Sequence, residues 1–184
     1  GEPIIIDTDE EPGRGNPDKI EKLRPAFDKE GTITAANASS INDGAAALTV
    51  ISNDKADELG MHSICRIIAH SSVAHEPLYF TTAPGKAITK VLKKSGLVIE
   101  DIDLFEINEA FSNVTLAAMR EHSIPHDKVN IHGGAVSLGH PIGASGARIL
   151  VTLISALQKK QKKRGLAALC IGGGEAAALI VEII

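Results

Sequence analysis

The sequence has few aromatic residues, few cysteines and no surplus of basic charge, and each shortage excludes a class of function. Aromatic residues make up 3% of the 184 residues, too few for the stacking platforms on which nucleic-acid bases lie. The net charge of −4 provides no positive field for nucleic acid or anionic lipid. Two cysteines are too few for a disulfide framework. We therefore expect no nucleic-acid partner and no disulfide-rich fold.

Long apolar runs and a secretion signal are also missing. No run approaches the roughly 18–20 apolar residues that span a bilayer. The acidic start, "GEPIIIDTDEEPGRG", lacks the basic segment followed by an apolar one that marks a signal peptide. The low cysteine count agrees with a reducing compartment. We expect an intracellular protein without a membrane partner, in the cytoplasm or an organellar matrix.

Apolar segments alternate with segments of helical periodicity along most of the chain, and 43% of the residues are hydrophobic, enough for a core. Strands are predicted at 45–52, 63–74, 102–107, 129–131, 165–173 and 177–184. Helices are predicted at 53–60, 82–96, 108–122 and 143–163. This alternation predicts an α/β layer fold with a mixed sheet, whose last two strands are antiparallel across a turn at 172–175.

A glycine-rich segment, "GGAVSLGHPIGASGARIL" (133–150), places His140 just before a predicted helix. The free N–H groups of such a turn suit an anion or an oxyanion. The segment has neither the Gly-Lys-Ser/Thr of a phosphate-binding loop nor the spacing of a dinucleotide-binding one. Tight packing explains the glycines as well as a site does, so the residues alone leave both interpretations open.

Two other candidate residues follow predicted strands. Cys170 precedes three glycines, which let a ligand approach the backbone, although a small buried cysteine is the commoner case. Asn108 could orient a water or a carbonyl, or simply cap the next helix. Glu109 could be a base or a favourable first-turn charge. These loops adjoin strand ends, where ligands bind in open α/β sheets.

No metal site is predicted, and the other cysteine, Cys65, is assigned to the core. His122 and His126 are four residues apart, but Pro125 breaks the helix that would align them. Cys65 lies within the apolar run "SICRII", without a glycine-rich turn beside it.

Four segments occur in order along the chain: "GTITAANASSINDGAAAL", "NEAF", "GGAVSLGHPIGASGARIL" and "CIGGGEAAALIVE". Together they resemble the thiolases, more narrowly acetyl-CoA acetyltransferases and 3-ketoacyl-CoA thiolases. The resemblance runs from about residue 31 to residue 184. It implies a thiolase-like half of the full fold, with a mixed five-stranded sheet covered by helices. We interpret 1–30 as a lead-in from the loop region and 31–184 as the C-terminal domain.

The resemblance implies a role for four catalytic residues. His140 is similar to the histidine that activates a nucleophilic cysteine and helps to hold an oxyanion. Cys170 is similar to the cysteine that moves a proton on and off the α-carbon or the leaving thiol. Asn108 resembles the residue that fixes a water in the first oxyanion hole. Gly172 matches the glycine whose N–H serves the second one.

The resemblance also implies the substrate and its binding residues. Coenzyme A and its acyl thioesters are the expected substrates, and no further cofactor is expected. Ser39 matches a serine near the pantetheine of coenzyme A, and Ala110 and Phe111 would line the same channel. The implied reaction is Claisen condensation or thiolytic cleavage of a 3-ketoacyl-CoA.

The chain departs from the family by the absence of the first half, which carries the nucleophilic cysteine. We therefore expect an acyltransferase component that is inactive alone and is completed by a thiolase N-terminal half. Uncovered helices and sheet predict association, with that half or with identical subunits in a homo-oligomer. The alternative is a non-catalytic module that binds coenzyme A or a protein partner. A ketoacyl synthase is disfavoured, because such enzymes pair the histidine with a second histidine or an asparagine.

Overall fold

The chain forms two units in the computed structural model, which describes residue 1 and residues 3–184, without the side chains of residues 12 and 14. The units are Gly1–Ala36 and Asn37–Ile184. The first contains a short helix, α1 (Glu10–Arg14), and a 3-10 helix, η1 (Pro17–Lys22). All the predicted site residues belong to the second unit. That the C-terminal domain starts at residue 31 stays a prediction.

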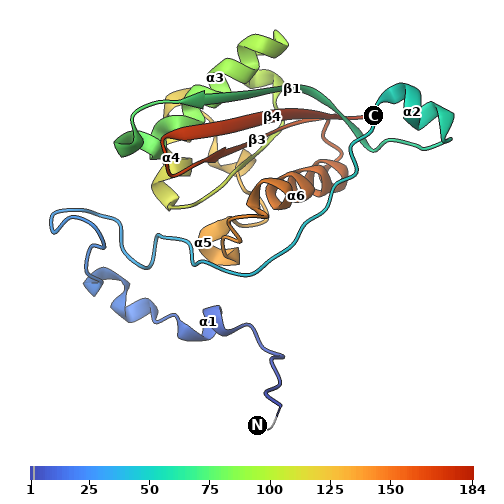
Figure 1. The fold of residues 1–184 in the computed structure, drawn as a ribbon. Coiled ribbons are helices and arrows are strands. Elements are labelled where there is room, and N and C mark those ends of the chain that lie inside the picture. Colours follow the sequence, from blue (N-terminus) through green and yellow to red (C-terminus); the bar gives the residue numbers. More distant parts are fainter. Residues whose placement is uncertain (2) are drawn as a thin grey trace. The chain divides into compact units, whose positions relative to one another are not determined.

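The second unit is built on a four-stranded mixed sheet in the order β1-β4-β3-β2 (Figure 1). Its strands are β1 (Cys65–Ala74), β2 (Leu104–Ile107), β3 (Arg164–Cys170) and β4 (Glu175–Ile183). Strand β4 is antiparallel to both β1 and β3, whereas β2 is parallel to β3. Because β2 and β3 run the same way, their carboxyl ends lie at the same edge of the sheet.

Helices cover both faces of this sheet. Helices α3 (Ala83–Ser95) and α4 (Ser112–His122) lie on one face, and α6 (Ser145–Lys160) lies on the other (Figure 1). The remaining elements are short: α2 (Asn53–Glu58), η2 (Pro77–Thr82), η3 (Ile99–Asp101), η4 (His126–Lys128) and α5 (Ala135–Leu138). Within the described ranges, no helix has the length and apolar character needed to cross a membrane.

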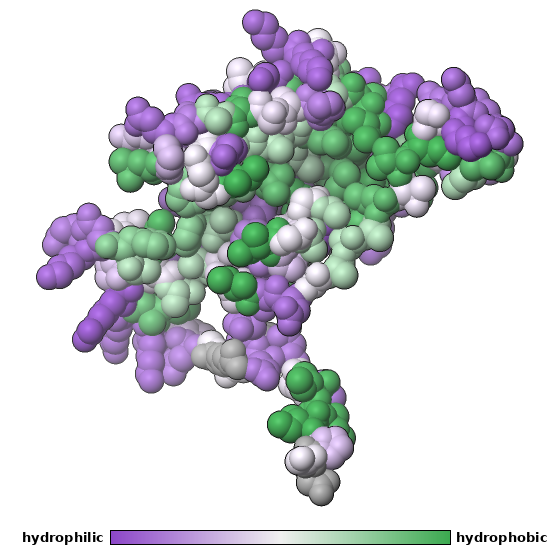
Figure 2. All heavy atoms as spheres, in the orientation of Figure 1, coloured by the Kyte–Doolittle hydropathy of each residue, from purple (hydrophilic) through white to green (hydrophobic). Residues whose placement is uncertain are grey.

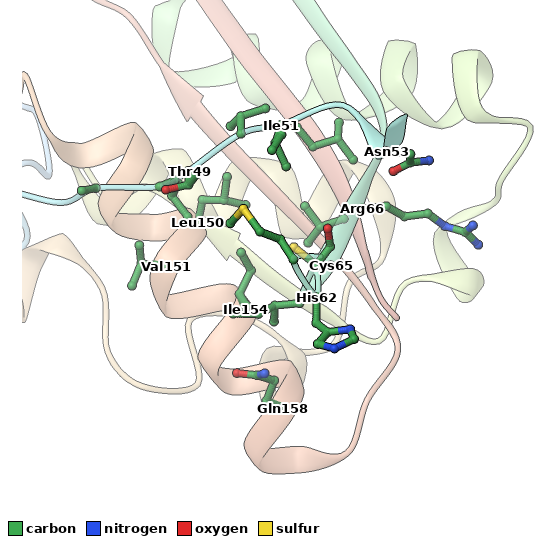
Figure 3. Close-up of a pocket in the computed structure, with 18 of the residues that line it drawn as sticks. Thr49, Ile51, Asn53, His62, Cys65, Arg66, Leu150, Val151, Ile154 and Gln158 are labelled. Carbon is green, nitrogen blue, oxygen red and sulfur yellow. The ribbon is translucent and has the colours of Figure 1, made fainter. Parts of the chain in front are cut away.

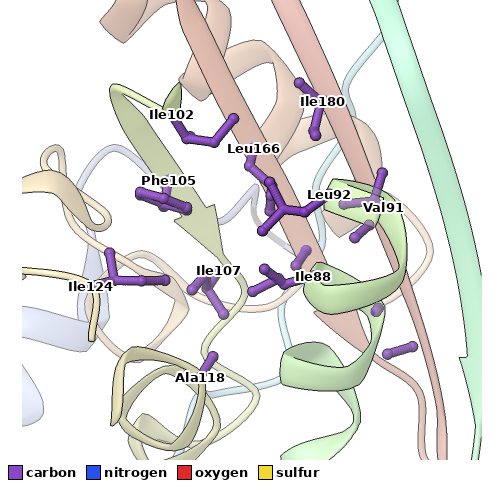
Figure 4. Packing of buried hydrophobic residues seen from close by; sticks show 14 of the residues in the cluster. Ile88, Val91, Leu92, Ile102, Phe105, Ile107, Ala118, Ile124, Leu166 and Ile180 are labelled. Atoms are coloured by element: carbon purple, nitrogen blue, oxygen red, sulfur yellow. The ribbon is translucent and has the colours of Figure 1, made fainter. Parts of the chain in front are cut away.

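Strand β2 divides its side chains between two hydrophobic clusters. Phe105 and Ile107 pack with Ile88 and Leu92 of α3 in the first cluster (Figure 4). Leu104 belongs to the second cluster, which includes buried residues of α6. Because successive strand residues point to opposite faces, positions 104, 106 and 108 share the α6 side of the sheet. This alternation brings two polar residues, Glu106 and Asn108, under α6.

The prediction of five strands is wrong, since the sheet has four. Residues 45–52 form no strand, although their composition is apolar, because they run along a groove beside α6 instead of pairing with the sheet. Residues 129–131 contribute only an isolated bridge between Val129 and Phe105, because Asn130 turns the chain away with a φ of 47°. The predicted α/β fold with a mixed sheet is confirmed, as is the antiparallel pairing of the last two strands.

The prediction of a helix over 108–122 is wrong at its start, because α4 begins at Ser112. Asn108 therefore does not cap that helix. The predicted helix at 82–96 is confirmed, with Gly96 ending it in a left-handed conformation. The helix expected at 143–163 is shorter, since α6 spans Ser145–Lys160.

Candidate active site

The backbone of His140 is held by the small-residue loop that precedes the sheet in sequence. Its N–H donates to the carbonyl of Ser40 at 2.9 Å and approaches Asn42 Oδ1 at 3.3 Å. Asn42 Oδ1 also accepts a hydrogen bond from the Ser40 hydroxyl at 2.7 Å. Gly139 has φ 93° and ψ 162°, a region that is essentially restricted to glycine. The glycine beside His140 is therefore required by the backbone.

The His140 imidazole is oriented by a hydrogen bond to the first residue of α6. Nδ1 lies 2.6 Å from Ser145 Oγ, and that hydroxyl donates its proton to the carbonyl of Pro141 at 3.0 Å. Since a hydroxyl has only one proton to donate, Ser145 accepts from Nδ1–H. The Nε2 lone pair of the neutral ring is then directed at Asn108, whose Nδ2 lies 3.4 Å away.

The surroundings of His140 favour its neutral form. Burial lowers the pKa of His140 below its ordinary value of 6.5, and the positive charge of Arg148 lowers it further. A neutral imidazole with Nδ1–H fixed can accept a proton at Nε2, which is what a general base requires.

Asn108 directly follows β2 and is almost fully buried. Its backbone N–H donates to the carbonyl of Ala168 in β3 at 2.9 Å, which fixes it at the carboxyl edge of the sheet. Its Oδ1 is buried and has no hydrogen-bond partner among the described residues. Because an unpaired buried acceptor is costly, this atom is suited to holding a water or another donor.

Glu109 anchors the glycine-rich segment. Its carboxylate accepts hydrogen bonds from Val136 N–H at 3.1 Å and from Asn130 Nδ2 at 3.3 Å. The Asn130 side chain also bonds both backbone groups of Ile107. The interpretation of Glu109 as a first-turn charge is wrong, because α4 starts at Ser112.

Cys170 and Gly172 lie at the same sheet edge as Asn108. Cys170 ends β3, where it pairs with Ala176 of β4, and Gly172 lies in the turn that joins the two strands. Burial raises the pKa of the Cys170 thiol, although a backbone hydrogen bond opposes this shift. No described residue accepts a hydrogen bond from Gly172 N–H. Likewise, across the described part of the chain, no hydrogen bond joins Cys170 to His140.

The three predicted substrate-binding residues lie together beside this edge. The backbone and hydroxyl of Ser39 both donate to the carbonyl of Ala110, at 3.2 and 2.9 Å. Phe111 pairs with Ala38 in an isolated bridge, and its ring lies edge-on to Phe80 at 6.1 Å between centroids. The loop around Ser39 is thus tied to the segment that follows Asn108.

An apolar groove lies away from these residues, between α6, the start of β1 and the segment 47–53. Its volume is about 790 Å³, and it is lined by segments 47–53 and 61–67 together with α6. Leu150, Val151 and Ile154 of α6 face it, opposite Thr49 and Ile51 (Figure 3). Hydrophobic atoms gather in the hollow between α2 and α6 (Figure 2). The groove does not include His140, so it is a surface distinct from the polar site.

Sequence reasoning missed both Ser145 and Asn42 as partners of His140. A signal for Ser145 was present, because a serine five residues after His140 lies in the first turn of the helix predicted at 143–163. Asn42 lies 98 residues before His140, and no local pattern connects positions so far apart.

Replacing Gly139 by alanine should destabilise the chain by about 1–3 kcal/mol, the usual cost of a side chain in a glycine-only conformation. The new Cβ would also overlap the Asn42 side chain. Urea unfolding of the variant measures this cost. Gly143→Ala is the matched control, because a Cβ there meets open space, and it should change stability by less than about 0.5 kcal/mol. Equal effects of the two variants would contradict the account of the turn.

Two family models match the chain. The model of the thiolase C-terminal domain matches residues 61–183, and that of the thiolase N-terminal domain matches residues 1–54. The match to the C-terminal domain covers the whole sheet and the His140 segment.

Acetyl-CoA acetyltransferases and a thiolase are similar to this chain over nearly all of its length. An acetyl-CoA acetyltransferase of Thiocystis violacea is 50% identical over 99% of the chain and 46% of its own length. The crystal structure of the Bacillus anthracis acetyl-CoA acetyltransferase superposes with a TM-score of 0.87, at 44% identity, over 91% of this chain and 42% of that one. The crystal structure of an Ascaris suum thiolase in complex with coenzyme A superposes with a TM-score of 0.86 at 44% identity. The match covers 97% of this chain and 47% of that one. The chain thus spans just under half the length of these relatives.

Proposed function

Because the chain belongs to the thiolase family, we propose that it is the C-terminal part of an acetyl-CoA acyltransferase. It supplies the histidine, His140, the acid–base cysteine, Cys170, and the oxyanion-hole groups. An N-terminal half supplies the nucleophilic cysteine. The observation that carries this proposal is the Ser145–His140–Asn108 contact, which leaves Nε2 of His140 unprotonated and beside Asn108 at the carboxyl edge of the sheet. The substrate class, a 3-ketoacyl-CoA, follows the acetyl-CoA acetyltransferases that the chain resembles.

In the first step of thiolysis, His140 Nε2 takes the proton of the nucleophilic cysteine of the other half. The sulfur attacks the 3-keto carbon, the bond between C2 and C3 breaks, and the acyl group stays on the sulfur. The carbonyl carries negative charge during attack, and donors at Asn108 and protonated His140 offset it; one such donor typically contributes roughly 3–4 kcal/mol. The released acetyl-CoA enolate takes its proton from the Cys170 thiol.

The second step restores both residues. The Cys170 thiolate takes the proton of incoming coenzyme A, whose sulfur then attacks the acyl-cysteine. The cysteine leaves as a thiolate and recovers its proton from His140. Both residues thus regain their starting protonation states, and the thiol proton of coenzyme A is replaced, through Cys170, by the new C–H bond of acetyl-CoA. The Gly172 N–H is open to an oxyanion of the thioester. The raised pKa of Cys170 keeps it a thiol, and therefore a proton donor, at neutral pH.

The apolar groove beside α6 is where we place the N-terminal half. Its lining is mainly apolar, and covering apolar surface removes it from water, which favours association. The relatives are about twice as long as this chain, so the N-terminal half of such a protein is of similar size to this chain. Identical subunits would then associate through other surfaces.

The test is reconstitution. The chain alone should not cleave acetoacetyl-CoA, whereas mixing it with a polypeptide that carries a thiolase N-terminal domain and its cysteine should restore cleavage. The measurement is the loss of acetoacetyl-CoA and the gain of acetyl-CoA. Should the two polypeptides bind each other and the mixture stay inert, the acyltransferase proposal is wrong and the chain is a binding module.

A further inference from the structure

A buried pair of opposite charges lies beside the Asn108–His140 contact and has no part in the steps above. Glu106 is 1% exposed and lies two residues before Asn108. Arg148 lies in α6, and its Nη1 is 3.9 Å from Glu106 Oε2. Removing both charges from water costs more than such a long ion pair returns. The pair therefore requires an explanation other than stability.

The pair lies behind the two residues that contact the imidazole. Glu106 and Asn108 occupy the same side of β2, because strand side chains alternate. Ser145 and Arg148 are three residues apart in α6 and so are neighbours on one face of that helix. Ser145 contacts Nδ1 of His140, and Asn108 contacts Nε2. Each member of the pair is thus next to one of the two contacts.

Hydrogen bonds do not satisfy this pair. Nε, Nη1 and Nη2 of Arg148 and Oε1 of Glu106 are buried, and none has a hydrogen-bond partner among the described residues. Water does not reach these atoms, so their charges are weakly screened. The field of the guanidinium therefore extends to its neighbours, and His140 is one of them.

The protonation of Glu106 changes that field near neutral pH. Burial raises the pKa of Glu106 to about 7; Arg148 opposes the shift and Glu109 adds to it. The charged groups acting on Glu106 and His140 in the described structure are thus Arg148 from α6, Glu106 from β2 and Glu109 after β2. As pH falls through about 7, Glu106 becomes neutral. Glu106 then no longer offsets the positive charge of Arg148, at a pH where His140 is still neutral. The full Arg148 charge opposes protonation of the imidazole, which therefore stays neutral to lower pH.

We propose that Arg148 and Glu106 are positioning residues that set the protonation state of His140. The positive charge of the guanidinium favours the neutral form of the imidazole. The Glu106 carboxylate, when ionised, partly offsets that positive charge. Their importance for catalysis rests on the proposed function, whereas the electrostatic coupling is a property of this chain.

NMR titration of the imidazole nitrogens in the ¹⁵N-labelled chain tests this coupling without any enzymatic activity. The His140 signals are identified by their loss in H140Q. In R148M the His140 midpoint should rise by roughly one unit, a typical size for an environmental shift. In R148K, which keeps the charge, it should return close to the wild-type value. R120M is the matched control, because Arg120 is an exposed arginine on α4, across the sheet, and its loss should leave the midpoint in place.

E106Q provides a second readout. In the wild type, the His140 signals should show an additional inflection near the Glu106 pKa of about 7, and E106Q should abolish it. An unchanged midpoint in a folded R148M, or an equal shift in R120M, would overturn the proposal. If R148M does not fold, E106Q decides, because persistence of the inflection contradicts the coupling. If the reconstituted enzyme is inert but the NMR titrations give the expected shifts, the proposed function is wrong and the electrostatic coupling stands.

Discussion

Replacing His140 by alanine in the reconstituted enzyme should lower kcat for acetoacetyl-CoA cleavage by about a thousandfold, within the range typical of a lost general base. The variant removes the Nε2 that faces Asn108, and with it both the acceptor of the cysteine proton and an oxyanion donor. Steady-state cleavage rates measure the loss. His132→Ala is the matched control, because His132 is exposed directly before the glycine-rich segment and its loss should leave kcat unchanged. A His140→Ala enzyme as active as the control would contradict the assignment.

The pH profile of the wild-type enzyme follows from the same assignment. The reaction requires neutral His140, so activity is present above its pKa and is lost as pH falls through it. Because burial and Arg148 lower that pKa below 6.5, the acidic limb should lie below pH 6.5.

Replacing Cys170 by alanine should lower kcat by about a hundredfold or more, again the range of a lost acid–base group, but at a different step. Without the thiol, the enolate of acetyl-CoA has no proton donor, and incoming coenzyme A has no base. Transfer of an acetyl group from acetyl-CoA to the other half should be slowed less, because His140 starts it and coenzyme A can leave as a thiolate without the Cys170 proton. Exchange of the C2 protons of acetyl-CoA with deuterium from solvent measures the lost function directly.

Cys170→Ser separates proton transfer from packing. Serine keeps the size of the side chain, but its hydroxyl is a far weaker acid than a thiol, so this variant should be as slow as Cys170→Ala. Wild-type deuterium exchange in Cys170→Ser would show that the thiol moves no proton.

Much of the fold could be predicted from local patterns, and the errors have one physical origin. Helix α3 could be predicted because Pro84 and Gly96 mark its two ends. Residues 45–52 have a strand's composition but form no strand, since composition does not provide a pairing partner. Asn130 shows the same limit, because its left-handed backbone depends on hydrogen bonds to Ile107, 23 residues away.

For the site, residue chemistry alone left His140, Cys170 and Asn108 each with an ordinary structural explanation. Only the resemblance of four ordered segments to thiolases joined them into one proposal. The structure adds what neither could provide: Ser145 as the group that fixes the His140 tautomer. Likewise, Arg148 and Glu106 are 42 residues apart in the sequence, and tertiary packing alone brings them together.

The central claim is that His140 of this chain activates the nucleophilic cysteine of a thiolase N-terminal half. Mass spectrometry of the N-terminal half, after acetyl-CoA is added to the reconstituted complex, tests it most directly. With the wild-type chain, that half should gain the mass of one acetyl group on its cysteine. With His140→Ala it should gain none. Equal acetylation with the wild-type chain, with His140→Ala and with no chain at all would contradict the account.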